Sequence, residues 1–475
     1  MKHTDIIQKL NLEQKCALLS GETVFTTRAL PGKGIPAITL SDGPNGVRKQ
    51  AGAADHLGLN PSVPATCFPT SSATACSWDE KLGEAVGEAL GEEAAAQEVA
   101  VLLGPGLNIQ RSPLCGRDFE YFSEDPILAG RMAAAYVRGI QKNGISACPK
   151  HFAVNSQELR RMASDSVLDE RTLRELYLTG FEIVVKEAKP KTIMTSYNLI
   201  NGTYANENAH LLQDILRKDW GFDGAVVTDW GGSNDHALGV KNGSTLEMPC
   251  PGGDSIRELM KAVQDGKISE ADVDARLDEM LELVLSTHAA VEKAPRTFDA
   301  AAHHKLARRA AAESIVLLRN EGGILPLKPN EKLAVIGDFA ETPRYQGAGS
   351  SAVNALQVDT LLDSIKADDS GITFVGYASG FERQGAADAE KLEEAVALAR
   401  KADTVLLCLG LDELRESEGL DRSDMKLAEN QQQLLAAVAA VNPNVVVLLS
   451  AGAPVETPWV GQCRALVYGA LGGQA

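Results

Sequence analysis

The sequence predicts an α/β protein of two unlike domains, a barrel of alternating strands and helices followed by a doubly wound α/β sandwich. Over residues 1–290, short apolar runs alternate with helical patterns, an order that gives parallel strands and most simply a closed barrel. Over residues 306–475, strands and helices alternate again, as they do in an open parallel sheet. Residues 291–305, rich in Ala, Lys and His with one Pro, are the expected linker.

The barrel elements follow one another in a regular order. Each unit is a helical pattern followed by an apolar run, and one of the helices begins with Pro126, a residue suited to a first turn. The predicted units are helix 79–97 with strand 99–103, helix 126–142 with strand 145–148, helix 169–187 with strand 192–196, helix 208–219 with strand 224–229, and a closing helix 269–287. Such a barrel carries its chemistry at the carboxyl ends of its strands.

The second domain opens with an amphipathic helix predicted over residues 305–318. Strands are expected at 333–338, 372–377, 404–409, 445–450 and 465–468, with helices 387–401 and 429–440 between them. The glycines after Ile336 do not form G-x-G-x-x-G, which argues against a dinucleotide site. The chain stops at Ala475, just after a strand, so we expect an incomplete sandwich, truncated at its C-terminus, whose open edge favours a homo-oligomer or a completing chain.

Composition excludes several classes of protein. A formal net charge of -18 argues against nucleic-acid and anionic-membrane partners, and an apolar content of 44% excludes a disordered chain. No apolar run approaches the ~18 residues that span a bilayer, and the first residues lack the apolar core of a signal peptide. Eight scattered cysteines without a close Cys-x-x-Cys pair predict reduced thiols in a cytoplasmic protein.

No metal ion or organic cofactor is predicted. The one pair of adjacent histidines, His303 and His304, lies in the linker without an obvious third ligand. Histidines in that setting are expected to be solvated rather than to bind a metal.

Asp229 is the most informative residue of the chain. It ends the apolar run 224–228 and is followed by Trp230 and two glycines. The position corresponds to the carboxyl end of a buried parallel strand. A carboxylate beside an aromatic face suits a sugar, because acids act on the glycosidic bond while rings stack on Trp. By itself the pattern fits an aspartate that caps the next helix about as well.

A glycosidase needs a second carboxylate, about 5–5.5 Å from the first in the retaining type. The best remote candidates are in the loop 416–422, which follows the predicted strand 404–409 at the carboxyl end of the second sheet. Both Glu416 and Glu418 lie there, and a solvated acidic loop is the simpler explanation of the same residues. A cleft between two domains is a common place for such a site.

Several longer stretches extend this pattern along nearly the whole chain. They are SDGPNGVR at 41–48, GRDFEYFSEDP at 116–126, KHF at 150–152, MTSYN at 194–198, VTDW at 227–230 and EGLDR at 418–422. As an ordered set they resemble the β-glucosidase branch of glycoside hydrolase family 3. The resemblance implies a TIM-like barrel, an α/β sandwich and a site between them.

The resemblance also implies roles for individual residues. Asp229 matches the nucleophile that forms a covalent glycosyl-enzyme, and Glu418 matches the general acid/base, with Glu416 as its rival. We expect the neighbouring Asp229 carboxylate to raise the pKa of Glu418 until glycosylation consumes that charge. The residues implied to hold the sugar are Asp42, Arg117, Lys150, His151, Arg161, Met194, Tyr197, Trp230 and Ser350.

Several of these residues have a structural alternative. Arg117 could form salt bridges with Asp118, Glu120 or Glu124, which are near it in sequence. Tyr197 is expected to orient the nucleophile through its hydroxyl or to pack in the barrel. Trp230 offers a stacking face or a core indole.

The predicted function is a retaining, exo-acting β-glucosidase that hydrolyses terminal β-D-glucosyl residues. A β-N-acetylglucosaminidase is disfavoured because residues 153–156, after KHF, lack the His or Asp of that branch. A β-xylosidase is disfavoured because an acid at Asp42 suits a sugar with a 6-hydroxymethyl group. A non-catalytic sugar-binding fragment and a nucleotide-binding regulator are the alternatives from other classes.

Overall fold

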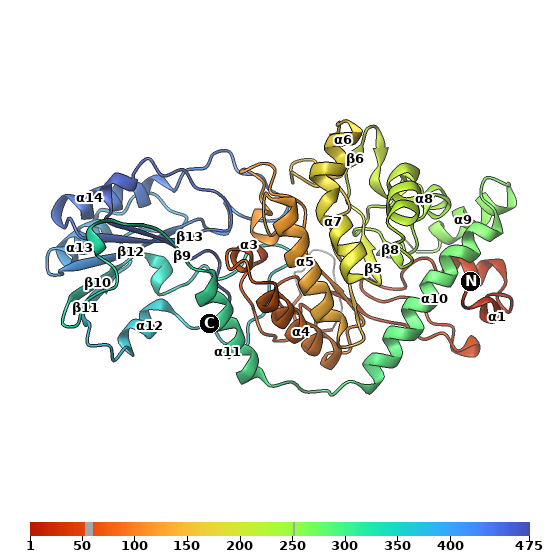
Figure 1. Ribbon diagram of the computed structural model, residues 1–475, viewed down its shortest axis with the longest axis horizontal. Coiled ribbons are helices and arrows are strands. Elements are labelled where there is room, and N and C mark those ends of the chain that lie inside the picture. The colour runs from red at the N-terminus through yellow and green to blue at the C-terminus, as the bar shows by residue number, and fades with distance from the viewer. Residues whose placement is uncertain (53–59, 250–251) are drawn as a thin grey trace.

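The computed structural model describes residues 1–52, 60–249 and 252–475. It contains a barrel-like domain and an α/β domain that lie side by side, so the predicted fold class is confirmed (Figure 1). The long helix α10 (Glu270–Lys293) ends the first domain, and residues 294–299 then cross to α11 (Ala300–Ser314). Helix α11 therefore begins inside the segment 291–305, where the sequence predicted a linker.

Short parallel strands form the wall of the barrel. Two groups are hydrogen-bonded internally, one in the order β1-β2-β3 and the other pairing β5 with β8. The backbone N–H of Phe152 donates to the carbonyl of Met194 over 2.7 Å and links the groups. The strands are β1 (Leu40–Asp42), β2 (Val101–Leu103), β3 (Ser146–Ala147), β5 (Thr192–Met194) and β8 (Ala225–Val227).

The remaining side of the barrel is irregular. A parallel bridge joins Val227 to Leu246, and a second joins Glu247 to Ser20. Antiparallel bridges at Gly21–Thr27 and Thr26–Thr39 continue from there to the residue before β1. The loops of this domain form a small separate sheet that is not part of the ring of barrel strands. It consists of β4 (Asp165–Ser166), β6 (Leu199–Ile200) and β7 (Thr203–Tyr204).

Helices surround the barrel strands. They are α4 (Glu80–Ala96), α5 (Pro126–Gln141), the continuous helical segments α6 to η4 over 170–188, η6 (His210–Asp219), α8 (His236–Asn242), α9 (Asp254–Gln264) and α10. Helices α4 and α5 pack closely because glycines face the contact: a Cβ on Gly87 would come 2.4 Å from the carbonyl oxygen of Tyr136. Aspartates cap several of these helices, and Asp79 and Asp125 accept N–H groups of the first turns of α4 and α5.

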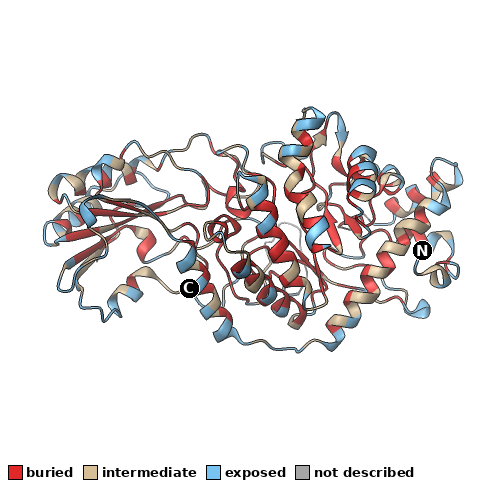
Figure 2. Ribbon diagram, in the orientation of Figure 1, coloured by how far each residue is buried: buried red, intermediate tan, exposed pale blue. Residues whose placement is uncertain are grey.

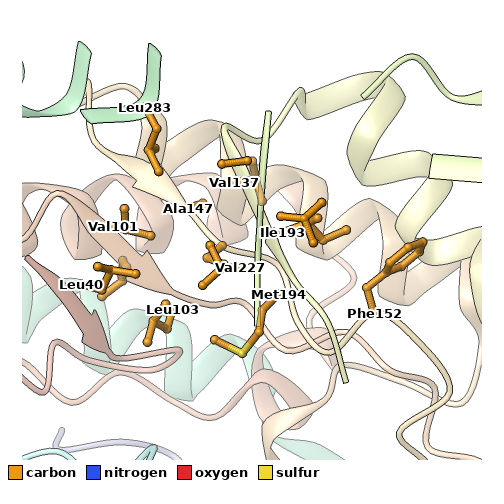
Figure 3. Close-up of a cluster of buried hydrophobic side chains, with 14 of the residues drawn as sticks. Leu40, Val101, Leu103, Val137, Ala147, Phe152, Ile193, Met194, Val227 and Leu283 are labelled. Atoms are coloured by element: carbon orange, nitrogen blue, oxygen red, sulfur yellow. The ribbon is translucent and has the colours of Figure 1, made fainter. Parts of the chain in front are cut away.

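The barrel core is filled by side chains from the strands. Figure 3 shows Leu40, Val101, Val227 and their neighbours grouped between the strands and the surrounding helices. These side chains are completely or almost completely buried, which stabilises the fold by about 1.5–3 kcal/mol each. Figure 2 shows that burial is concentrated in the strands and on the helix faces turned towards them.

The second domain contains one six-stranded sheet in the order β11-β10-β12-β13-β14-β9. All neighbours are parallel except β9, which pairs antiparallel with β14. The strands are β9 (Val316–Asn320), β10 (Lys332–Ile336), β11 (Thr373–Ala378), β12 (Thr404–Gly410), β13 (Val445–Ser450) and β14 (Ala465–Tyr468). The helices between them are α12 (Leu361–Lys366), α13 (Ala389–Ala399) and α14 (Glu429–Val441).

The helix predicted over 305–318 is partly wrong. Helix α11 ends at Ser314, and the next residues form β9 at the edge of the sheet, where Val316 pairs with Tyr468. The apolar run of Ile315 to Leu318 suited either a helix or a strand. Pairing with β14 makes these residues a strand, because strand formation depends on tertiary neighbours more than on intrinsic propensity.

The described residues contain no helix of the length and apolarity that a bilayer crossing requires. The seven cysteines within the described ranges are free thiols, and six of them are buried. Cys250 lies outside those ranges.

The expectation that His303 and His304 are solvated is wrong. His303 is buried between α11 and α4, with Nδ1 2.7 Å from Glu93 Oε1 and Nε2 3.2 Å from Glu92 Oε2. His304 bonds to Asp359 over 2.9 Å. Among the described residues, no group of three or more His, Cys, Asp or Glu side chains is arranged to bind a metal ion.

The His303 pair makes stability depend on pH. Burial by itself lowers the pKa of His303, but the two carboxylates outweigh burial and raise the pKa above its ordinary value. Stabilisation by a histidine with a raised folded-state pKa is complete below the unfolded value of about 6.5, and it is lost as pH rises through the folded value. We therefore expect the difference in melting temperature between wild type and His303→Gln to shrink as pH rises from about 6 to 9.

Thermal melting of both proteins across that range checks this expectation. His288→Gln on α10 is the matched control, since it makes the same change in the same domain without removing the pair with Glu93. A His303→Gln variant whose melting temperature runs parallel to that of the wild type at every pH contradicts the assignment.

Candidate active site

A cavity of about 450 Å³ is lined by loops of both domains at the carboxyl ends of β1, β5 and β8. Eleven of the residues singled out from the sequence line it. They are Asp42, Arg117, Lys150, His151, Arg161, Met194, Tyr197, Asp229 and Trp230 from the barrel, and Ser350 and Glu418 from the sandwich. Phe25, Met162, Gly231 and Pro249 also line the cavity and were not identified from the sequence.

Asp229 follows the end of β8 by two residues. Its Oδ1 accepts the N–H of Trp230 over 2.7 Å, and its Oδ2 lies 3.7 Å from His151 Nε2. Burial raises the pKa of Asp229, Arg161 and Arg117 oppose the rise, and Glu418 adds to it. The helix-capping alternative does not apply, because Asp235 caps the next helix, α8.

Glu418 approaches the same cavity from the sandwich. Its Oε1 lies 2.8 Å from Arg161 Nη1 and 3.5 Å from Arg117 Nη1, while its Oε2 accepts the backbone N–H of Ser350 over 2.8 Å. Only 17% of the Glu418 side chain and 13% of the Asp229 side chain are exposed, so both carboxylates are largely desolvated yet reachable.

The pKa of Glu418 is lowered, whereas the sequence analysis expected it to be raised. Burial alone raises it, but Arg117, Arg161 and the hydrogen bonds from Ser350 outweigh burial and hold the pKa well below its usual range. The sequence-based expectation of a raised pKa for Glu418 is therefore wrong for this arrangement. The reason is that two guanidinium groups contact Glu418, and their attraction exceeds the repulsion from a carboxylate.

Glu416, the rival in the same loop, does not line the cavity. It is completely buried, and its Oε1 accepts the backbone N–H of Gly452 over 2.9 Å. Burial raises the pKa of Glu416 to about 7. Arg344 also donates to the carbonyl oxygen of Glu416, so this residue ties its loop to the interior of the sandwich.

His151 is held by a hydrogen bond to the hydroxyl of Tyr121. Asn155 Nδ2 donates to the Tyr121 hydroxyl over 2.9 Å, and that hydroxyl lies 3.1 Å from His151 Nδ1. Burial, followed by Arg117, Lys150 and Arg161, lowers the pKa of His151 well below its ordinary value, so the ring is neutral. The Tyr121 hydroxyl has its own proton to give to Nδ1, and in that arrangement the proton of His151 is on Nε2, facing Asp229.

Arg117 and Lys150 share a buried partner that the sequence did not single out as a site residue. Arg117 makes two hydrogen bonds to Glu120, at 2.8 and 2.9 Å, and Lys150 Nζ lies 3.1 Å from Glu120 Oε1. Glu120 is fully buried, and the two cations hold its pKa below the ordinary value against the effect of burial. The salt-bridge alternative for Arg117 is therefore correct in part, because Arg117 pairs with Glu120 and also faces Glu418.

Trp230 and Tyr197 form one wall near Asp229. The indole N–H of Trp230 donates to the carbonyl of Val24 over 2.7 Å, and its ring lies 5.3 Å from that of Phe25. The Tyr197 hydroxyl donates to the carbonyl of Trp230 over 2.8 Å, and Arg161 sits over the Tyr197 ring at 4.9 Å. Tyr197 thereby holds the chain segment that carries Asp229.

Asp42, Met194 and Ser350 complete the lining. Asp42 and Met194 end β1 and β5. Burial raises the pKa of Asp42 to about 6, with Lys150 lowering it and Glu418 raising it. Ser350 contributes the backbone N–H that binds Glu418. The cavity therefore combines carboxylates and cations along one side with aromatic rings on another, the arrangement expected for a ring with many hydroxyl groups.

Residues 48–283 match the Glycosyl hydrolase family 3 N terminal domain, and residues 315–475 match the Glycosyl hydrolase family 3 C-terminal domain. The chain belongs to glycoside hydrolase family 3. Both matches agree with the resemblance seen in the sequence, and together they include each of the site residues except Asp42.

The chain is similar to several named proteins. It is 45% identical to thermostable beta-glucosidase B of Acetivibrio thermocellus over 99% of the chain, and 44% identical to exo-alpha-(1->6)-L-arabinopyranosidase of Bifidobacterium longum. It spans 62% and 63% of the lengths of these relatives. The crystal structure of Bifidobacterium adolescentis GH3 beta-glucosidase, 42% identical, matches 99% of this chain and 67% of its own with a TM-score of 0.92.

The charge arrangement generates a prediction about Glu418. Replacing Arg161 by Met removes the contact at 2.8 Å, so the pKa of Glu418 should rise. In the wild type, we expect no protonation of Glu418 between about pH 4 and 8, whereas the variant should show it. Infrared difference spectra against the corresponding Glu418→Gln proteins isolate the carboxyl stretch of this residue. Arg160→Met, an exposed arginine in the same loop, is the control. A carboxyl band that titrates identically in all three proteins contradicts the assignment.

Proposed function

We propose that this family 3 hydrolase removes terminal β-D-glucosyl residues with retained stereochemistry, through a covalent glycosyl-enzyme on Asp229. The observation that carries the proposal is that Asp229 and Glu418, from different domains, line one cavity. Glu418 adds to the raised pKa of Asp229, and Arg161 lies 2.8 Å from Glu418 and over the ring of Tyr197, which bonds to the residue after Asp229. Two carboxylates that flank one position are what glycoside hydrolysis requires, and retention requires them to be about 5–5.5 Å apart.

In the first step, an Asp229 oxygen attacks the anomeric carbon while the bond from that carbon to the leaving oxygen breaks. Glu418 gives its proton to the leaving oxygen, so the alcohol departs neutral and a glycosyl ester remains on Asp229. Because Arg161 and Arg117 favour the ionised form of Glu418, this step requires their contact to weaken when the sugar and its aglycone bind. Arg161 has a second acceptor in Glu158, at 2.7 Å, to which it can remain bonded.

In the second step, Glu418 is a carboxylate again and acts as base. It takes a proton from water as the water oxygen attacks the anomeric carbon, and the ester bond to Asp229 breaks. Two inversions give net retention, and both carboxyl groups return to their starting states. Arg117 and Arg161 assist this step because they favour the ionised form of Glu418. Asp229 carries no charge at this stage, since it is part of the ester.

The polar lining suits a glucose ring. Asp42 can accept hydrogen bonds from distal hydroxyls, and Lys150 and His151 Nε2 can donate to ring hydroxyls. The indole of Trp230 offers an apolar face at the side of the cavity. A pyranose bound in this way meets donors and acceptors that are already held in place by Glu120 and Tyr121.

α-L-Arabinopyranosides are the second candidate substrates. The observation that favours them is the 44% identity with the arabinopyranosidase, almost equal to that with the β-glucosidase. This pentopyranose lacks the hydroxymethyl group of a hexose, so the two substrates differ at the distal end of the ring, where Asp42 is proposed to bind. A site that hydrogen-bonds a hydroxyl has a much lower kcat/KM for the analogue that lacks it, so a direct comparison of substrates distinguishes the candidates.

A panel of aryl glycosides tests the substrate. We expect kcat/KM to be highest for the β-glucoside, with lower values for the β-xyloside, β-N-acetylglucosaminide and α-L-arabinopyranoside. Proton NMR of the first released sugar should show the β anomer of glucose. An α anomer contradicts retention, and a preference for the arabinopyranoside contradicts the glucoside assignment. An inactive protein that still binds glucose would be a sugar-binding protein instead.

Substitutions test the two carboxylates. Asp229→Ala should lower kcat by about ten-thousand-fold or more, because a nucleophile that acts in a unit has no substitute. Glu418→Ala should keep most of its kcat/KM on substrates with good leaving groups, and azide should restore turnover by attacking the glycosyl-enzyme without a base.

Glu416→Ala is the matched control in the same loop. It should lower the stability of the protein, because the buried N–H of Gly452 loses its acceptor, but azide should not restore turnover. Azide rescue in Glu416→Ala, and its absence in Glu418→Ala, would overturn the assignment of the acid/base.

A further inference from the structure

Asp421 joins the loop that carries Glu418 to two loops of the barrel. Its Oδ1 accepts the backbone N–H groups of Gly116 over 3.2 Å and of Glu158 over 2.9 Å. Its Oδ2 accepts the N–H of Leu159 over 2.8 Å. One carboxylate of the sandwich therefore satisfies three backbone donors of the barrel domain, and hydrogen bonds to a charged acceptor are among the stronger ones in proteins.

Glu158 makes the reciprocal contact from the barrel. Its side chain is completely buried, and its Oε2 accepts the backbone N–H of Gly419 over 2.8 Å. The same oxygen lies 2.7 Å from Arg161 Nη1, which also contacts Glu418. Glu158 thus binds the residue directly after Glu418 and the guanidinium that contacts the Glu418 side chain.

The barrel loop 114–116 and the sandwich loop 416–422 approach each other so closely that no side chain fits between their backbones. A Cβ on Gly116 would come 1.6 Å from the carbonyl oxygen of Leu420. The N–H of Arg422 donates to the carbonyl of Leu114 over 2.8 Å. Backbone contact on both sides of Asp421 means that the position of the loop 416–422 depends on the barrel as well as on its own domain.

We propose that Asp421 and Glu158 form a reciprocal latch between the domains that positions Glu418 over the sugar. The proposal rests on the proposed function, since it assigns positioning roles around the acid/base of that reaction. Neither Asp421 nor Glu158 lines the cavity, so both act through Glu418 rather than on the substrate. The latch is needed because nucleophile and acid/base belong to different domains, and a shift of about 1 Å between catalytic groups costs about a hundredfold in rate.

Asp421→Asn is the most informative variant. The amide keeps the size of the carboxylate but replaces one acceptor oxygen with a donor, which must face a backbone N–H of Gly116, Glu158 or Leu159. Asp424→Asn is the matched control. Asp424 is half-buried like Asp421 and follows it in the same segment, but it accepts the N–H of Lys426 and lies 3.9 Å from Arg415, both of its own domain.

The kinetic test separates positioning from general damage. The ratio of kcat/KM for dinitrophenyl β-glucoside to that for phenyl β-glucoside is measured, because only the phenyl substrate needs strong acid assistance. In Asp421→Asn, kcat/KM for the phenyl substrate should fall about 10- to 100-fold while that for the dinitrophenyl substrate changes little. Azide should raise kcat of the variant on the dinitrophenyl substrate. Asp424→Asn should resemble the wild type in each measurement.

Equal losses on both substrates, or no loss on either, overturn the proposal. Equal losses would mean that Asp421 supports the fold as a whole rather than the position of Glu418.

Hydrogen exchange gives a readout that does not depend on the substrate. In Asp421→Asn the amides of Gly116, Glu158 and Leu159 should lose protection, and the segment 416–420 should exchange faster, while β8 and the strand β12 stay protected. If the wild type hydrolyses no glucoside, the proposed function fails and this measurement alone decides the latch. Unchanged protection of the three amides in Asp421→Asn then overturns the latch as well.

Discussion

The site depends on pairing buried carboxylates with a small number of cations. Asp42, Glu120, Glu158, Asp229 and Glu418 converge within one region, together with Arg117, Lys150 and Arg161. Taking an ionised carboxylate out of water costs several kcal/mol unless a partner offsets the loss. Each cation here contacts at least one of the acids, so the cavity can be dry enough for catalysis while its carboxylates stay charged.

Arg161 illustrates how one cation serves more than one purpose. It bonds to Glu158 and Glu418 and lies over the ring of Tyr197, whose hydroxyl holds the segment of Asp229. The guanidinium of Arg161 therefore lowers the pKa of both proposed catalytic groups, Asp229 and Glu418. In the proposed cycle that influence hinders the acid step and assists the base step, because the two steps need opposite charge states of Glu418.

Division of the site between domains gives the interface a functional role. The barrel supplies Asp229 and most of the lining of the cavity, and the sandwich supplies Glu418 on a loop after β12. In an enclosed barrel site, strand register alone would fix the geometry of both acids. Here it also depends on the contacts between loops 114–116, 158–162 and 416–422, in which backbone groups bond to side-chain carboxylates.

The sequence by itself determined the two kinds of domain, most of the strands and helices, and eleven of the fifteen residues that line the cavity. The elements follow from local periodicity, and the lining residues follow from the resemblance to a family that short motifs along the chain carry. The tertiary structure decided the rest. It placed Glu418 rather than Glu416 in the cavity, turned residues 316–320 into an edge strand, buried His303 against α4 and reversed the expected pKa shift of Glu418. Each of these outcomes depends on partners distant in sequence, such as Arg117 and Arg161 for Glu418, and the energy of a buried charge is set by the groups around it in space.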